Sequence, residues 1–155
     1  MHYASVKWIC FLLFVVVGKV AMAEGITSPD GNLRLEFTVN ALGEPVYQLF
    51  YKEKAVVNPS KLGLELVGDP GLMNGFTLVE AGASTFDETW KPVWGEVSQI
   101  RNHYNELAVT LDQKEQNRHI VIRFRLYDDG LGFRYEFPLQ RTLHYFTVKE
   151  EIGRA

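Results

Sequence analysis

The feature of this sequence that most restricts its fold is a repeated alternation of apolar and polar residues. From Leu33 to Val39 apolar residues occupy every second position, and from Ile120 to Leu126 they do so again. In the second segment Arg123 lies between Ile122 and Phe124. Successive side chains of a strand point to opposite faces, so this period predicts strands with one buried face. No segment shows the apolar spacing of an amphipathic helix.

Turn-forming residues separate the expected strands. Proline fixes φ and glycine adopts positive φ without strain, so Ser28–Gly31 predicts a turn, and Asp129-Gly130 predicts the turn of a hairpin. The strands expected between such signals are residues 33–39, 45–54, 62–66, 76–80, 106–112, 119–127, 133–137 and 143–148. Short strands divided by turns and no periodic helix predict an all-β chain, an antiparallel β-sandwich.

The first 23 residues have the layout of a secretory signal peptide. Lys7 precedes the apolar run Ile9–Val17, and Ala21-Met22-Ala23 forms an A-x-A cleavage pattern. The run is shorter than the roughly 20 apolar residues that a membrane-spanning helix needs. We therefore expect a signal peptide at 1–23 and a mature domain at 24–155 without membrane attachment. A retained N-terminal anchor is the alternative.

Charge and cysteine content exclude several classes of function. Loss of Lys7 and Lys19 with the leader changes the formal net charge from −3 to −5. An acidic chain without a basic cluster predicts no nucleic-acid partner and no anionic membrane surface. Cys10, the single cysteine, lies in the leader, which excludes disulfides and thiolate chemistry after cleavage. Secretion without disulfides suggests the periplasm or outer surface of a Gram-negative bacterium.

The sequence shows no catalytic pattern of its own. A hydrolytic pair needs two carboxyl groups on opposite sides of a bond, and spacing does not place Asp87, Glu88 or Glu96 in such a pair. Asp128 and Asp129 precede a glycine and are typical turn formers. The histidines lack metal-ligand spacing, and no P-loop or nucleophile elbow is present. We expect no catalytic residue, metal site or cofactor in this chain.

The segment Thr89–Glu96 is the most unusual part of the sequence. It holds Trp90 and Trp94, whereas the third tryptophan lies in the leader. Pro92 and Gly95 disfavour a helix and a central strand, which predicts a loop or a sheet edge. Exposed indoles would suit a sugar ring or an interface, and buried indoles would fill the core between two sheets. The residues alone leave both alternatives open.

Three segments resemble the N-terminal domain of glycoside hydrolase family 97. They are Thr89-Trp90-Lys91-Pro92-Val93-Trp94-Gly95-Glu96 with its continuation Ile100–Leu107, the hairpin Arg123–Phe137, and the turn Ser28–Gly31. The resemblance runs from about Ser28 to Glu151, and the tryptophan segment is its most specific part. It implies a mutarotase-like β-super-sandwich followed in the full enzyme by a catalytic (β/α)₈ barrel and a C-terminal β domain. This chain would end about midway through the sandwich.

The resemblance also implies a function. Family members are secreted, typically calcium-dependent α-glycosidases that act on α-glucosides or α-galactosides, with catalytic residues and most calcium ligands in the barrel. This chain would then be the carbohydrate-contacting and domain-packing part, without activity alone. The residues expected at the substrate or barrel interface are Trp90, Lys91, Trp94, Glu96 and Arg101. A standalone periplasmic β-sandwich that binds a sugar or a protein is the alternative.

Overall fold

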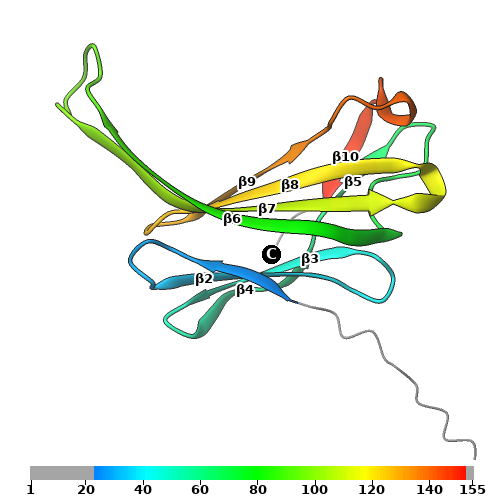
Figure 1. Cartoon of the computed structure of the whole chain (residues 1–155), viewed down its shortest axis with the longest axis horizontal. Coiled ribbons are helices and arrows are strands. Elements are labelled where there is room, and N and C mark those ends of the chain that lie inside the picture. The colour runs from blue at the N-terminus through cyan, green and yellow to red at the C-terminus, as the bar shows by residue number, and fades with distance from the viewer. Residues whose placement is uncertain (1–22, 153–155) are drawn as a thin grey trace, which may run out of the picture.

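The computed structural model describes residues 23–152, and these residues are mostly strands (Figure 1). Two single 3₁₀ turns, η1 (Lys114–Gln116) and η2 (Arg141–Leu143), interrupt them. The signal peptide expected at 1–23 lies almost entirely outside the described residues. The strands are β1 (Glu24–Thr27), β2 (Leu33–Val39), β3 (Pro45–Tyr51), β4 (Lys54–Lys61), β5 (Gly63–Leu66), β6 (Phe76–Trp90), β7 (Ile100–Gln113), β8 (Arg118–Leu126), β9 (Leu131–Glu136) and β10 (Val148–Ile152).

The strands form two layers. One antiparallel sheet has the order β1-β2-β3-β4, the other has the order β6-β7-β8-β9, and β5 pairs with β10 in a small third sheet. Figure 1 shows the first sheet beneath the second. The expected all-β, antiparallel β-sandwich is confirmed.

The core lies between the two large sheets. Phe37 of β2 and Phe124 of β8 are fully buried, and their ring centroids are 5.6 Å apart. The ring centroids of Tyr47 in β3 and Phe133 in β9 lie 6.3 and 6.0 Å from that of Phe124. The apolar positions of the alternating segments therefore face inward, as the period of two predicts. Further buried members of the core are Leu33, Leu35, Leu49, Leu107, Val109, Leu111, Ile120, Ile122 and Leu126.

A glycine allows two loops to meet at one end of the sandwich. Gly43, with φ of 72°, accepts a hydrogen bond from the Phe76 N–H at 3.0 Å through its carbonyl. A Cβ atom at Gly43 would lie 2.6 Å from the Phe76 nitrogen. Both the positive φ and the close backbone approach thus require glycine at this position.

The expected strands at 45–54 and 143–148 do not have the predicted bounds. The segment 45–54 divides into β3 and β4, because Lys52 and Glu53 adopt positive φ of 46° and 65° and form a tight hairpin turn. Such turns usually carry asparagine and glycine, so this one had no recognisable signal. The strand expected at 143–148 is wrong: η2 ends at Leu143, and β10 runs from Val148 to Ile152. The bounds of β10 depend on its pairing with β5, which is distant in sequence, so the local pattern did not reveal them.

Strands β6 and β7 are much longer than the expected strands 76–80 and 106–112. They pair without interruption from Glu80 opposite Thr110 to Trp90 opposite Ile100. Their distal parts, residues 86–104, extend past the last pair between β7 and β8 and project beyond the sandwich as a two-stranded arm (Figure 1). Because most of the arm's β6 side chains are exposed and polar, an apolar alternation could not reveal this part of the strand.

Candidate functional site

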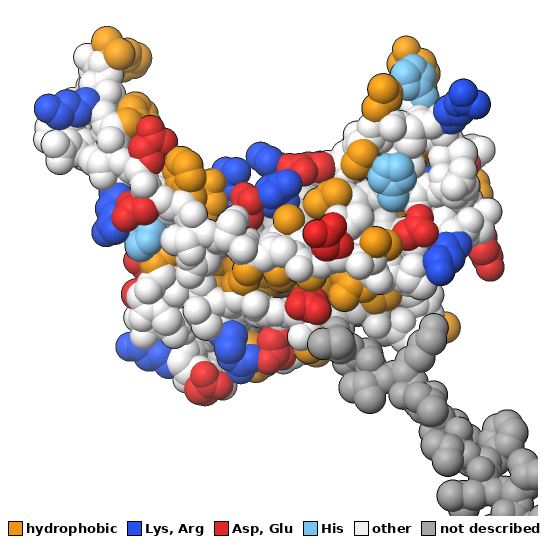
Figure 2. Space-filling view, viewed as in Figure 1, with side chains coloured by type: hydrophobic (Ala, Val, Ile, Leu, Met, Phe, Trp, Pro, Cys, Tyr) orange, Lys and Arg blue, Asp and Glu red, His pale blue; other side chains and the backbone are white. Residues whose placement is uncertain are grey.

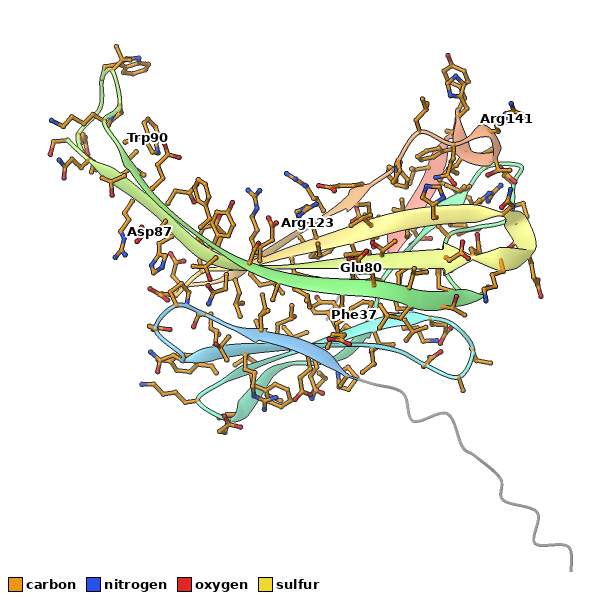
Figure 3. The ribbon with its side chains drawn as sticks, viewed as in Figure 1. Phe37, Glu80, Asp87, Trp90, Arg123 and Arg141 are labelled. Atoms are coloured by element: carbon orange, nitrogen blue, oxygen red, sulfur yellow. The ribbon has the colours of Figure 1, made fainter. Side chains whose placement is uncertain are left out.

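The outer face of the β6-β7-β8-β9 sheet forms the floor of a concave surface. Figure 2 shows the surface hollowed between the arm and a second projection, which carries Arg141 in Figure 3. We call this surface the concave face. It is built from the polar positions of the same strands whose apolar positions form the core.

A chain of five alternating charges crosses the floor of the concave face. The Arg125 Nε donates to Glu106 at 2.8 Å, and the Arg123 Nη1 donates to the other oxygen of Glu106 at 2.6 Å. The Arg123 Nε donates to Glu136 at 2.9 Å, and Arg134 also donates to Glu136, from Nη2 at 2.6 Å. The order Arg125, Glu106, Arg123, Glu136, Arg134 therefore begins and ends with a cation.

Strand register produces this network. Glu106 lies opposite Arg125, whereas Arg123 lies opposite Arg134. Like charges on directly opposite positions are destabilising. Glu136 lies two residues from Arg134 on the same face and forms ion pairs with both arginines, which reduces their repulsion.

The network shifts both carboxyl groups toward the ionised form. Burial alone would raise the pKa of Glu106, whose side chain is 11% exposed, but hydrogen bonds from Arg125 and Arg123 lower it. Hydrogen bonds from Arg123 and then Arg134 lower the pKa of Glu136 to about 2. Both groups are therefore anions at neutral pH.

A row of aromatic rings leads from the floor to the arm. Phe86 stacks on Tyr104 with centroids 5.2 Å apart, and Tyr127 contacts Tyr104 at 5.2 Å. The Arg125 guanidinium lies over the Tyr104 ring at 4.6 Å. Trp90 lies four residues beyond Phe86 on the same face of β6, so the row points toward the arm's end.

Both tryptophans of the arm are exposed. Trp90 ends β6 with 48% of its surface accessible, and Trp94 is 88% accessible in the turn that joins β6 to β7. The alternative that these indoles fill the core is wrong. The expected loop or sheet edge is confirmed, since β6 is an outer strand and residues 91–99 form the connecting loop.

The structure does not bring all five predicted site residues together. Lys91 and Glu96 lie in the exposed loop near Trp94. Arg101 lies opposite Thr89, so it shares the face of the arm that Trp90 does not occupy. Figure 3 shows Trp90 and Asp87 on opposite sides of the arm.

Arg101 has a partner on its own side of the arm. Its Nε and Nη2 donate to the two oxygens of Asp87 at 2.8 and 2.7 Å. These hydrogen bonds lower the pKa of Asp87. The bidentate pair links β6 to β7 across the arm, in addition to their backbone pairing.

A second hollow, of about 560 Å³, lies between the outer strands β1 and β6. Its lining includes Leu35, Ser84, Thr85 and Asn105 and holds no aromatic side chain. It therefore lacks the flat apolar surface on which a sugar ring stacks. The concave face is the better candidate for a functional surface.

The described residues contain neither a cluster of acidic, histidine or cysteine side chains nor a membrane helix. Between residues 23 and 152 no three His, Cys, Asp or Glu side chains lie close enough to share a metal ion. A calcium ion of the kind that the family resemblance implies would therefore lack a carboxylate cluster there. In the same range no helix has the length and apolar character to cross a membrane.

Comparison with known families decides the relationship of this chain. A family model described as glycosyl-hydrolase 97 N-terminal matches residues 26–154. The chain belongs to this family. The retaining alpha-galactosidase of Bacteroides thetaiotaomicron is 28% identical over 135 residues, which cover 83% of this chain and 19% of that protein.

Solved structures of similar proteins have the same fold. A family 97 enzyme from Pseudoalteromonas, solved with acarbose, superposes with a TM-score of 0.79 at 30% identity and covers 84% of this chain and 20% of its own. A beta-arabinopyranosidase superposes with a TM-score of 0.73 at 26% identity over 83% of this chain and 20% of its own. This chain thus spans about a fifth of the length of the relatives that it matches.

Proposed function

We propose that this family 97 domain is the domain-packing and carbohydrate-contacting N-terminal part of a secreted α-glycosidase. In this proposal its concave face packs against the catalytic barrel. The observation that carries the proposal is the exposed aromatic surface of Trp90 and Phe86 beside a floor of ordered charges. Aromatic and arginine side chains around a concavity are typical of interfaces and of sites between domains.

Carbohydrate contact would occur at the end of the arm. Exposed indoles such as Trp90 and Trp94 present flat faces to the apolar side of a sugar ring, while Lys91 and Glu96 supply hydrogen-bonding groups. Related proteins include a retaining alpha-galactosidase and an enzyme solved with acarbose. We infer a substrate of the α-glucoside or α-galactoside class. Calcium, where the enzyme uses it, would bind outside residues 23–152.

The proposal predicts a loss of activity when the arm loses its indole. In an enzyme that joins this domain to the catalytic barrel of the family, Trp90→Ala should lower kcat/KM on nitrophenyl α-glycosides about tenfold. An aromatic contact at an interface is worth about 1–2 kcal/mol. Because Trp90 is half exposed, the melting temperature should change by only about 2 °C.

A control separates this effect from general surface damage. Leu42→Ala removes a more exposed apolar side chain from the loop at 40–44, away from the concave face, and should leave kcat/KM unchanged. Full activity of Trp90→Ala, or a stop codon without a following barrel sequence, would contradict the domain-packing role. The standalone alternative predicts instead that panose alters the tryptophan emission of the isolated chain, since Trp90 and Trp94 are its only tryptophans after residue 23.

Export predicts a defined mature terminus. The A-x-A pattern at 21–23 should direct cleavage after Ala23 and leave Glu24 as the first residue in a periplasmic fraction. N-terminal sequencing of the protein purified from that fraction measures this directly. A mature protein that begins at Met1 would show that the leader is retained as an anchor.

A further inference from the structure

A small hollow interrupts the floor of the concave face. It has a volume of about 180 Å³ and is lined by Arg123, Arg125, Tyr127, Gly132, Phe133 and Arg134. Gly132 lies opposite Arg125 in the β8–β9 register, and its missing side chain leaves the space open. A Cβ atom at Gly132 would meet no other atom within 4 Å.

The charges around this hollow leave an excess of one cation. The alternating network contains three arginines and two glutamates, and its two terminal members, Arg125 and Arg134, both line the hollow. Arg125 uses only its Nε in a hydrogen bond, so within residues 23–152 its two terminal nitrogens have no acceptor. The Nη1 of Arg134 likewise has no acceptor in that range.

These free donors match one kind of ligand. A guanidinium presents parallel N–H groups whose spacing fits the two oxygens of a carboxylate. The Tyr104 ring beneath Arg125 holds that guanidinium in place, and the charge pair with Glu106 fixes its Nε edge. The terminal nitrogens therefore remain available for an incoming anion.

We propose that the hollow between Arg125 and Arg134 is a carboxylate-binding site that receives an Asp or Glu side chain of the catalytic barrel. The inference rests on the proposed packing of the concave face. A protein carboxylate is favoured over an acidic sugar, because the hollow opens on the floor of that face rather than on the arm. Exclusion of water on packing would strengthen the ion pair.

Acetate tests the site on the full chain without the barrel. Side-chain Nε–Hε resonances of arginine, followed by NMR at constant ionic strength, should shift for Arg125 and Arg134 with half-saturation on the order of 10 mM acetate. Arg125→Gln should weaken this binding about tenfold, since hydrogen bonds to charged groups are individually strong. Arg125→Lys keeps the charge but loses the paired donors, so it should bind less acetate than the wild-type chain.

Two further variants distinguish a loss of the hollow from a loss of ion pairs or of surface charge. Gly132→Val should block the hollow while leaving every ion pair of the network intact, and it should abolish the acetate response. Arg101→Gln removes an arginine outside the hollow and should leave the response unchanged. Loss of binding in Arg101→Gln, or an equal response to chloride, would overturn the site.

The source of the carboxylate is tested separately. Glucuronate should bind no more tightly than acetate, and tenfold tighter binding would assign the site to an acidic sugar and overturn the proposed occupant. In the longer enzyme Gly132→Val should lower kcat/KM or the melting temperature. If Gly132→Val abolishes acetate binding but changes neither kcat/KM nor the melting temperature of the longer enzyme, docking at this hollow is contradicted. Full activity of Trp90→Ala would instead contradict packing by the arm.

Discussion

Replacing Phe124 with alanine should lower the free energy of unfolding by about 3–5 kcal/mol. Phe124 is fully buried and lies within 6.3 Å of the Phe37, Tyr47 and Phe133 rings, which come from three other strands. Its removal would leave a cavity at the centre of contact between the two sheets, where little can move to fill it. Urea denaturation followed by far-ultraviolet circular dichroism measures the change.

Trp94→Ala is the matched control. It removes a larger aromatic side chain, but Trp94 is 88% exposed in the loop of the arm, and the free energy of unfolding should change by about 0.5 kcal/mol or less. Tryptophan fluorescence is a poor probe here, because both indoles are exposed in the native state. A larger loss for Trp94→Ala than for Phe124→Ala would contradict the assignment of core and arm.

The sequence predicted those strands that have one buried face and one exposed face. Alternation placed β2 and β8 correctly because burial selects apolar residues at every second position. The distal part of β6 has largely exposed side chains, so no pattern marked it, although it pairs fully with β7. The turn at Lys52 and Glu53 was missed for a different reason, since its positive φ angles are held by the pairing of β3 with β4.

The candidate site was predicted only in part. Composition singled out Trp90 and Trp94, and their exposure depends on how far the arm projects, which no local pattern encodes. Glu106, Arg125 and Arg134 were not among the predicted site residues. Arg123 and Arg125 were visible as the polar half of an alternating strand, but the network also needs Glu106 to lie opposite Arg125. That placement is a matter of register between β7 and β8, which depends on all the pairs of both strands.

The two faces of the β6-β7-β8-β9 sheet therefore have different roles. Inward positions of β8 build the core through Ile122 and Phe124, and outward positions build the charged floor through Arg123 and Arg125. A shift of register by one residue would exchange the two faces. The apolar core consequently fixes the geometry of the concave face as firmly as the ion pairs do.

Acid should destabilise the domain through Glu136. Hydrogen bonds from Arg123 and Arg134 lower the pKa of Glu136 from the ordinary 4.5 to about 2. A lowered folded-state pKa stabilises the fold above pH 4.5, and this contribution disappears as the pH falls through 2. At about 1.4 kcal/mol per pKa unit, and with partial solvent screening of a side chain that is 31% exposed, the loss should be about 2 kcal/mol between pH 6 and pH 2.

Glu136→Gln isolates this contribution. Glutamine does not titrate, so the variant should be less stable than the wild-type chain by about 2 kcal/mol at pH 6 and equally stable at pH 2. Hydrogen bonds from Ser28 and Asn32 also lower the pKa of Asp30 to about 2. Asp30 still titrates in the variant, so the variant keeps some sensitivity to acid. Glu88→Gln removes an exposed carboxyl group that forms no ion pair within residues 23–152 and should follow the wild-type profile. Urea denaturation from pH 6 to pH 2 measures the free energy of unfolding of both chains. If this free energy falls equally with pH in Glu136→Gln and in the wild-type chain, the network does not stabilise the sheet.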